Sequence, residues 1–176
     1  MGYSDRFFTY DVTTTTAGTY RMYLSYISGS TRRLTVTVNG INDYPNSFNS
    51  VDWNVVYVKE IDIVLTAGLN TLKFHNPENN QPFGGGNDQW APNVDKFRLE
   101  LMVNWDGSES TDWATAGNWD TNFVPTAGDN VVIPSVSNLP IISGVTNAAT
   151  RDLNVNSSLT INSGGSLIVM VLQQET

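Results

Sequence analysis

His75 is the only histidine in this 176-residue chain, which contains no cysteine. A Ser-His-Asp triad would have to use His75, and no serine lies in a nucleophile-elbow motif. Thiolate nucleophiles, disulfides and cysteine-bound metals are excluded. Two carboxylates could cleave a glycosidic bond, but only five glutamates occur, and no carboxylate lies in a recognisable cleft motif. We therefore expect a protein that is not an enzyme, and a glycosidase or lyase is kept as an alternative.

The stretch 76–92 combines an aromatic side chain with amides. Asn79, Asn80 and Gln81 precede a run of three glycines, and Trp90 follows it. An aromatic ring can pack against the C–H face of a pyranose, and amides can bind its hydroxyls. The glycines lack the G-x-G-x-x-G order and the strand-to-helix context of a phosphate loop. Trp90 is therefore a candidate platform for a sugar; the alternative is that its ring covers the edge of the core.

The composition excludes several partners. Nine basic residues are outnumbered by 17 acidic residues, for a net charge of −8, so the cationic stripe that nucleic acids require is missing. No apolar run reaches the roughly 18 residues of a membrane span, and no secretion signal is visible. Polarity comes instead from 20 Asn, 19 Thr and 15 Ser, since only 15% of the residues are charged. Asn and Thr favour turns and strands over helix interiors.

Alternation of apolar and polar residues at period two predicts strands in the first part of the chain. Tyr20, Met22, Leu24 and Tyr26 should share one face of such a strand. Many short strands separated by turn signals such as Asn39-Gly40 indicate a β-sandwich or barrel. The predicted strands are 8–12, 19–26, 34–38, 55–58, 61–65, 69–74 and 94–102.

The composition changes near residue 104, which predicts two structural units, 1–103 and 104–176. Most aromatic residues and all but one of the basic residues precede this position. The second unit repeats an aliphatic-x-aliphatic step at Leu153, Leu159 and Leu167. Short aliphatic strands separated by Asn, Ser and Gly are typical of β-solenoid coils, which bury their faces by stacking. A β-hairpin or meander is the alternative.

Motifs across residues 2–103 follow one another in a recognisable order. They include Gly2-Tyr3, Ala17-Gly18-Thr19-Tyr20, Ala67-Gly68-Leu69-Asn70-Thr71 and Asn93-Val94-Asp95. This order resembles the family 6 and family 35 carbohydrate-binding modules, which are β-jelly-roll sandwiches attached to secreted glycan-degrading enzymes. The resemblance implies an all-β fold, with a jelly-roll sandwich followed by the small β-rich, solenoid-like segment.

The resemblance also implies a sugar site at the loop end of the sandwich, built from two aromatic residues and an asparagine. By position in the motifs, Tyr3, Trp53 and Asn93 match these residues, and Trp90 would extend the platform. A tyrosine and a tryptophan that hold a sugar ring, with an amide on its hydroxyls, form a coherent site. The alternatives are a core position for Trp53, a turn role for Asn93 and simple packing for Tyr3.

A structural calcium is the one cofactor that the resemblance suggests. The family binds it with a Glu-x-Glu pair on the first strand and an Asp on the last strand, which Asp95 matches. The Glu pair has no counterpart here, and two carboxylates are the usual anchor for this cation. No cofactor is therefore required, and Asp95 is the candidate ligand if calcium binds.

The lack of the family's first strand predicts an unfilled sheet edge. A free edge can accept a strand from another chain or from residues 104–176. Self-association through this edge is therefore an expected interaction.

The pattern Trp105-x-Gly107, followed by Trp113, Ala116-x-Asn118-Trp119 and Val124-Pro125-Thr126-Ala127, opens the second unit. It resembles modules of large secreted bacterial surface proteins and implies a structural or adhesive extension. We therefore expect a glycan-binding module of a larger secreted bacterial protein, located outside the cell or on its surface, with this chain as a fragment. The alternative is a structural or adhesive surface protein that self-assembles, with the sandwich as a spacer.

Overall fold

The chain forms two compact units, Met1–Leu99 and Glu100–Thr176. The computed structural model describes residues 7–76, 91–144 and 147–170. The chain passes from one unit to the next within a single strand, β7 (Asn93–Asn104). The boundary therefore lies a few residues before the composition change near residue 104. Among the described residues, no helix has the length and apolarity needed to cross a membrane.

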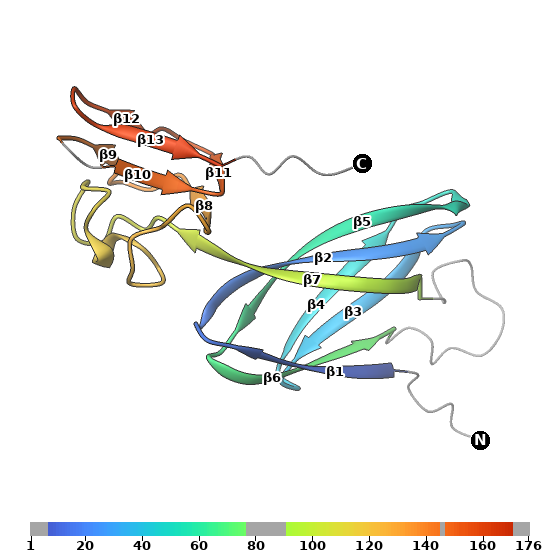
Figure 1. Cartoon of the computed structure of the whole chain (residues 1–176). Coiled ribbons are helices and arrows are strands. Elements are labelled where there is room, and N and C mark those ends of the chain that lie inside the picture. Colours follow the sequence, from blue (N-terminus) through green and yellow to red (C-terminus); the bar gives the residue numbers. More distant parts are fainter. Residues whose placement is uncertain (1–6, 77–90, 145–146, 171–176) are drawn as a thin grey trace, which may run out of the picture. The chain divides into compact units, whose positions relative to one another are not determined.

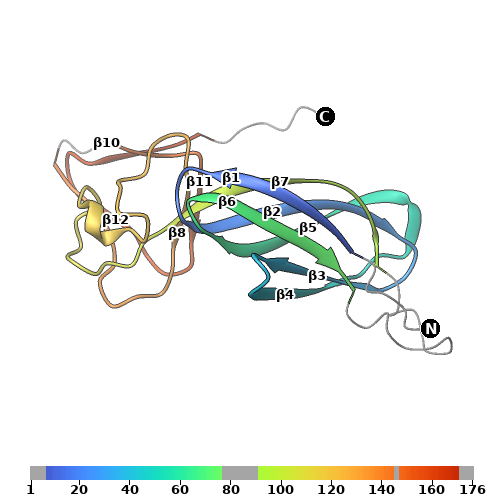
Figure 2. The same ribbon diagram turned by 90° about the horizontal axis from the view of Figure 1, so that it is seen from below.

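The first unit is a β-sandwich of two antiparallel sheets (Figures 1 and 2). One sheet has the order β1 (Phe7–Thr14), β6 (Gly68–His75), β3 (Arg32–Val38) and β4 (Asn42–Phe48). The other has the order β7, β2 (Gly18–Ser28) and β5 (Asp52–Leu65). This architecture confirms the predicted all-β sandwich.

The core of the first unit follows the predicted alternation. Tyr20, Met22, Leu24 and Tyr26 are all buried, and so lie on the inner face of β2. On the facing sheet, the buried apolar residues of β3 and β6 occur at every second position, namely Leu34, Val36, Val38, Leu72 and Phe74. Burial of alternate apolar side chains from both sheets is what holds a sandwich together.

Two strands of the first unit differ from the prediction. Strand β4 was not predicted because its sequence, NDYPNSF, shows no clear apolar alternation and contains Pro45. It lies at the edge of its sheet, where a proline is tolerated. Strand β5 is one strand of 14 residues rather than two short ones, because no turn-forming residue interrupts it.

The hairpin between β3 and β4 turns at the predicted Asn39-Gly40. Both residues have positive φ angles, 54° and 69°. The Ile41 N–H donates to the Val38 carbonyl oxygen at 3.0 Å, so Asn39 and Gly40 are the two central residues of the turn, and Ile41 is an extra residue before the paired strand. Positive φ angles at both central positions favour Asn-Gly. The register then pairs Val38 with Asn42 and Arg32 with Phe48.

The second unit contains two successive coils of short strands. Strands β8 (Asn130–Ile133), β9 (Ile141–Ile142) and β10 (Asn147–Thr150) form one coil, and β11 (Asp152–Val155), β12 (Thr160–Ile161) and β13 (Ser166–Val169) form the next. Each strand pairs in parallel with its counterpart, β8 with β11, β9 with β12 and β10 with β13. A hairpin or meander would pair antiparallel strands, so the coils are solenoid-like. The steps predicted at Leu153, Leu159 and Leu167 form the three sides of one coil.

Glycines at the corners let the two coils approach each other. Gly144 and Gly164 have φ angles of 67° and 85°. A Cβ atom on Gly164 would lie 3.2 Å from the carbonyl oxygen of Gly144 in the preceding coil. Glycine at both positions therefore permits the left-handed turn and the close spacing.

Tryptophans form the core of the Trp-bearing segment. Trp105, Trp113 and Trp119 are fully buried and pack edge to face, with ring centroids 5.0 and 4.7 Å apart. Asn118 is also fully buried, and its side-chain oxygen accepts hydrogen bonds from the backbone N–H groups of Glu109 and Ser110. In this structure the motif residues therefore build a core.

Candidate ligand-binding site

One end of the first unit brings together the beginnings of three strands. Arg32 begins β3, Asp52 begins β5 and Asn93 begins β7. Arg32 and Asn93 line the same cavity, and the guanidinium of Arg32 also reaches Trp53, one residue into β5. Arg32 thus contacts Trp53 and lines a cavity together with Asn93, and both of these residues belong to the predicted site.

Trp53 is displayed by a β-bulge. Tyr57 pairs with Tyr26 and Asp52 pairs with Ser28, so four residues of β5, residues 53–56, stand opposite Ile27 alone. The Asp52 carboxylate holds this segment by accepting a hydrogen bond from the backbone N–H of Asn54 at 2.8 Å. Bulges reorient side chains and are frequent beside functional sites.

The Trp53 side chain is 47% exposed, so its alternative placement in the core is wrong. Its ring lies against Gly29, where an added Cβ atom would come within 1.8 Å of the indole Nε1. The Arg32 guanidinium carbon lies 4.7 Å from the ring centroid, within the range of a cation–π interaction. The backbone of Gly29 and the Arg32 side chain therefore position the ring while nearly half of it stays open to solvent.

Arg32 connects Trp53 to the start of β7. Its Nη1 donates a hydrogen bond to the carbonyl oxygen of Ala91 at 3.2 Å. Its Nε is buried and finds no hydrogen-bond partner among the described residues. The guanidinium carries five N–H donors in a fixed plane, so it can bind hydroxyl or carboxylate oxygens beside the indole.

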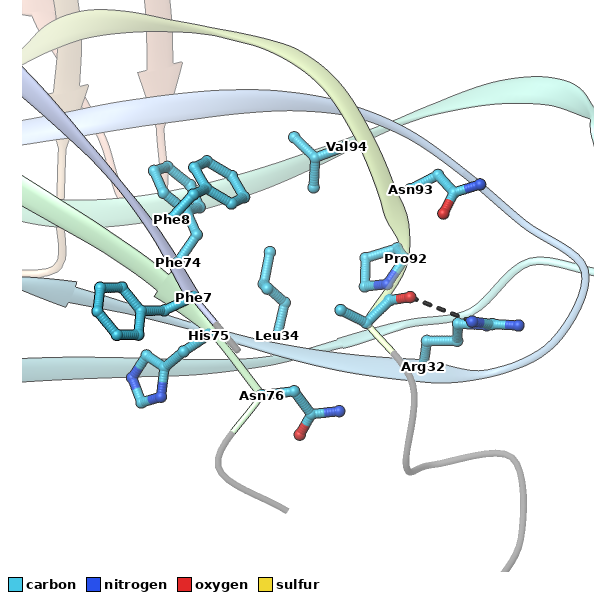
Figure 3. A pocket seen from close by; sticks show the side chains of 11 residues that line it. Phe7, Phe8, Arg32, Leu34, Phe74, His75, Asn76, Pro92, Asn93 and Val94 are labelled. Carbon is cyan, nitrogen blue, oxygen red and sulfur yellow. Dashed lines mark hydrogen bonds between the residues drawn. The ribbon is translucent and has the colours of Figure 1, made fainter. Parts of the chain in front are cut away.

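Asn93 is exposed at the first position of β7, after the buried Pro92. Figure 3 shows the side chains of Asn93 and Arg32 directed to the same side, away from Phe8 and Phe74. An amide, a guanidinium and an indole thus gather at this end of the sandwich. These are groups that can bind a sugar by hydrogen bonds and ring stacking.

A cavity of about 600 Å³ opens beside these residues (Figure 3). Its centre is apolar, with Leu34, Pro92 and Val94, and with Phe8 stacked on Phe74 at 4.7 Å. Arg32, His75, Asn76 and Asn93 supply its polar lining. A smaller cavity of about 360 Å³ shares Phe8 and Val94 with it and continues to Tyr10, Asp95, Lys96 and Phe97.

His75 lies in a chain of hydrogen bonds across three strands. The Thr37 hydroxyl is 2.6 Å from Asp43 Oδ1 and 2.7 Å from His75 Nε2. Because a carboxylate only accepts, the hydroxyl donates to Asp43 and accepts from the His75 Nε2–H. The imidazole thus donates a hydrogen bond to the Thr37 hydroxyl instead of accepting its proton. His75 therefore does not act as a base toward Thr37 in this arrangement.

Asp95, the candidate calcium ligand, is exposed and lines the smaller cavity next to Lys96. Within residues 7–76, 91–144 and 147–170, no group of three or more His, Cys, Asp or Glu side chains could hold a metal ion. No metal is therefore assigned to Asp95. The other two predicted site residues, Tyr3 and Trp90, lie outside the described residues.

Arg32 and Gly29 are the site residues that the sequence did not predict. Ser28-Gly29-Ser30 reads as an ordinary turn, and two consecutive arginines, Arg32 and Arg33, precede the strand. Alternation along the strand places them on opposite faces, but only the three-dimensional contact identifies which one reaches Trp53. Of the two residues, Gly29 gives the clearer sequence signal of a site, because a glycine allows an aromatic ring to approach the backbone closely.

A model of one protein family matches residues 104–174; its description is "Domain of unknown function (DUF8693)". This match covers the coils and the Trp-bearing segment, and its description gives them no function. No curated protein matches the chain.

Several solved structures are similar to the first part of the chain. A family 35 carbohydrate-binding module from Clostridium thermocellum is 29% identical over 53% of this chain and 68% of the module, with a TM-score of 0.43. A family 35 module from Cellvibrio japonicus is 18% identical over 53% of this chain and 63% of the module, with a TM-score of 0.43. An exo-β-1,3-galactanase from Phanerochaete chrysosporium is 22% identical over 53% of this chain but only 20% of the enzyme, with a TM-score of 0.42.

Proposed function

We propose that the first unit is a non-catalytic carbohydrate-binding module that binds a glycan at the end formed by Trp53, Arg32 and Asn93. The observation that carries the proposal is Trp53, a half-exposed indole displayed by a bulge and positioned by Gly29 and Arg32. Exposed aromatic rings with fixed orientation are suited to stack on the C–H face of a sugar. Asn93 supports the proposal because its exposed amide can bind hydroxyls beside the ring.

The motif order of residues 2–103 supports the same function independently of the geometry. Trp53 and Asn93 occupy the motif positions that the family 6 and family 35 modules use for sugar binding. Arg32 adds a charge that those motif positions do not include. The site is therefore proposed to bind a sugar with oxygen atoms that can accept several hydrogen bonds from a guanidinium.

The proposed context is a larger secreted bacterial protein, outside the cell or on its surface. The second unit supports this because stacked coils form extended, structural segments. In this arrangement the sandwich would bind the glycan and the coils would connect it to other parts of the protein.

A second candidate function is that of a structural or adhesive surface protein whose sandwich serves as a spacer and whose copies assemble. The aromatic residues exposed on the edge strand β1 favour this alternative. The two candidates are distinguished by glycan binding and by oligomeric state.

The experiment is a glycan array probed with the full chain, with and without calcium. We expect binding to a defined glycan class and its loss in Trp53→Ala. Val56→Ala is the matched control, because Val56 is an exposed residue of the same bulge. Polysaccharides that bind should release no reducing sugar. No binding to any glycan, or equal binding by Trp53→Ala, would contradict the proposal.

A further inference from the structure

Val51 has the most exposed large apolar side chain among the residues that the structure describes, at 88%. It directly precedes β5 and lies two residues before Trp53, which is itself 47% exposed. A single exposed aliphatic residue on a protein surface needs no functional explanation. Val51, however, is a near neighbour of the indole on which the proposed function rests, so its exposure bears on what that site can bind.

Alternation along the chain directs Val51 and Trp53 to the same side. Ser50 is buried and Val51 is exposed, whereas Asp52 is partly buried and Trp53 is exposed. In an extended chain, side chains two residues apart point to the same side and lie roughly 7 Å apart. A glycan that stacks one ring on the Trp53 indole can therefore bring the next ring of its chain to Val51.

The segment that carries Val51 is anchored on both sides. Before it, Phe48 is fully buried, and the buried Ser50 hydroxyl donates a hydrogen bond to the carbonyl oxygen of Ser28. After it, Asp52 pairs with Ser28 in the sheet. The β-branched valine side chain has few rotamers of its own. A ligand that covers Val51 therefore loses little free energy to ordering of the protein.

We propose that Val51 forms a second subsite, which contacts the sugar residue next to the one on Trp53. The proposal rests on the proposed function and makes the bound glycan an oligosaccharide or polysaccharide rather than a single sugar. Valine offers only C–H groups, so this subsite gains affinity by burial of apolar surface and does not distinguish hydroxyl patterns. The hydrogen bonds that select the sugar remain with Arg32 and Asn93.

The first test follows the two residues separately by NMR. The full chain is titrated with oligosaccharides of one to four units, built from the repeating sugar of the glycan class that the array selects. The indole N–H signal of Trp53, identified by its loss in Trp53→Ala, should shift with every member of the series. The methyl signals of Val51, identified by their loss in Val51→Ala, should shift only with the disaccharide and longer members.

Ile41 is the matched control for Val51. It is 81% exposed and follows the turn at the end of β3 opposite to Arg32. Its methyl signals should not shift with any sugar. Because Val51 and Ile41 are both exposed, neither Val51→Ala nor Ile41→Ala is expected to unfold the protein.

The second test measures the contribution of Val51 by calorimetric titration. The wild type should bind the disaccharide more tightly than the monosaccharide. Val51→Ala removes two carbon atoms from the subsite, so it should weaken disaccharide binding about fivefold and leave monosaccharide binding unchanged. Ile41→Ala should keep wild-type affinity for both sugars, and Trp53→Ala should lose binding of both.

The outcomes separate the two proposals. A wild-type chain that binds no glycan on the array would overturn the proposed function and the Val51 subsite with it. Equal affinity of the wild type for monosaccharide and disaccharide, or Val51 methyl signals that stay in place, would overturn the subsite alone. Equal weakening of monosaccharide and disaccharide binding in Val51→Ala would also overturn it, because Val51 would then act only on the position of the Trp53 ring.

Discussion

The guanidinium carbon of Arg32 lies 4.7 Å from the centroid of the Trp53 ring. Arg32 is the first residue of β3 and Trp53 is the second residue of β5, which belongs to the other sheet, so their contact joins the two sheets. The arginine also donates a hydrogen bond to Ala91, just before Asn93. This contact links the indole to the start of β7.

Replacement of Arg32 is expected to weaken glycan binding. Arg32→Gln keeps a planar donor group but removes the charge over the Trp53 ring, a contact that contributes roughly 0.5–2 kcal/mol. We expect about fivefold weaker binding in calorimetric titrations with the strongest ligand from the array. Arg33→Gln is the control, as that exposed residue lies on the opposite face of β3. Equal affinities of the Arg32→Gln variant and the wild type would show that Arg32 does not contribute to glycan binding.

Gly29→Ala should displace the Trp53 ring. The added Cβ atom would lie 1.8 Å from the indole Nε1, far inside van der Waals contact. The ring is half-exposed and can move, so the expected result is a loss of affinity similar to that of Trp53→Ala with little change in the melting temperature. Circular dichroism and calorimetry measure the two effects. Gly128→Ala is the control, because its Cβ atom would meet only Thr126 Oγ1 at 3.8 Å.

Asn118→Ala should destabilise the second unit. The Asn118 side chain is fully buried; it accepts from two backbone N–H groups and donates to Ser110 Oγ and the Asp112 carbonyl, both at 2.9 Å. Unpaired buried polar groups cost about 1–3 kcal/mol each, so we expect a loss of about 3 kcal/mol in the free energy of unfolding. Urea denaturation measures it. Asn154→Ala, at an exposed position, should cost little; a small effect of Asn118→Ala would show that the segment tolerates loss of this network.

Stability of the first unit should fall in alkaline solution. Burial raises the pKa of the Tyr20 phenol, an effect that hydrogen bonds to Thr14 and Thr16 oppose, and burial also raises the pKa of Tyr26. The folded state therefore favours the neutral phenols. Their contribution to the free energy of unfolding is complete below the ordinary tyrosine pKa of 10.0 and is lost as the pH rises above that value. Urea midpoints between about pH 9 and about pH 11 should fall less in the Tyr20→Phe/Tyr26→Phe variant than in the wild type. A substitution of an exposed residue that does not titrate, Val56→Ala, should follow the wild type.

The sandwich could be predicted from sequence where alternation and turns agree. Strand β2 and the turn at Asn39-Gly40 lie as expected because burial of one face and a positive φ are local requirements. Strand β4 could not be predicted, since its conformation depends on pairing with β3 rather than on its own residues. The motifs indicated Trp53 and Asn93, whereas Arg32 could be assigned only from the packing between sheets.

The central claim is that Trp53 binds a sugar, and calorimetric titration of Trp53→Ala tests it most directly. With the strongest ligand from the array, stacking losses of roughly 1–3 kcal/mol should weaken binding about tenfold or more. The control, Val56→Ala, should keep wild-type affinity, and the melting temperatures of all three proteins should agree. A Trp53→Ala variant that binds the same glycan with wild-type affinity would contradict the account.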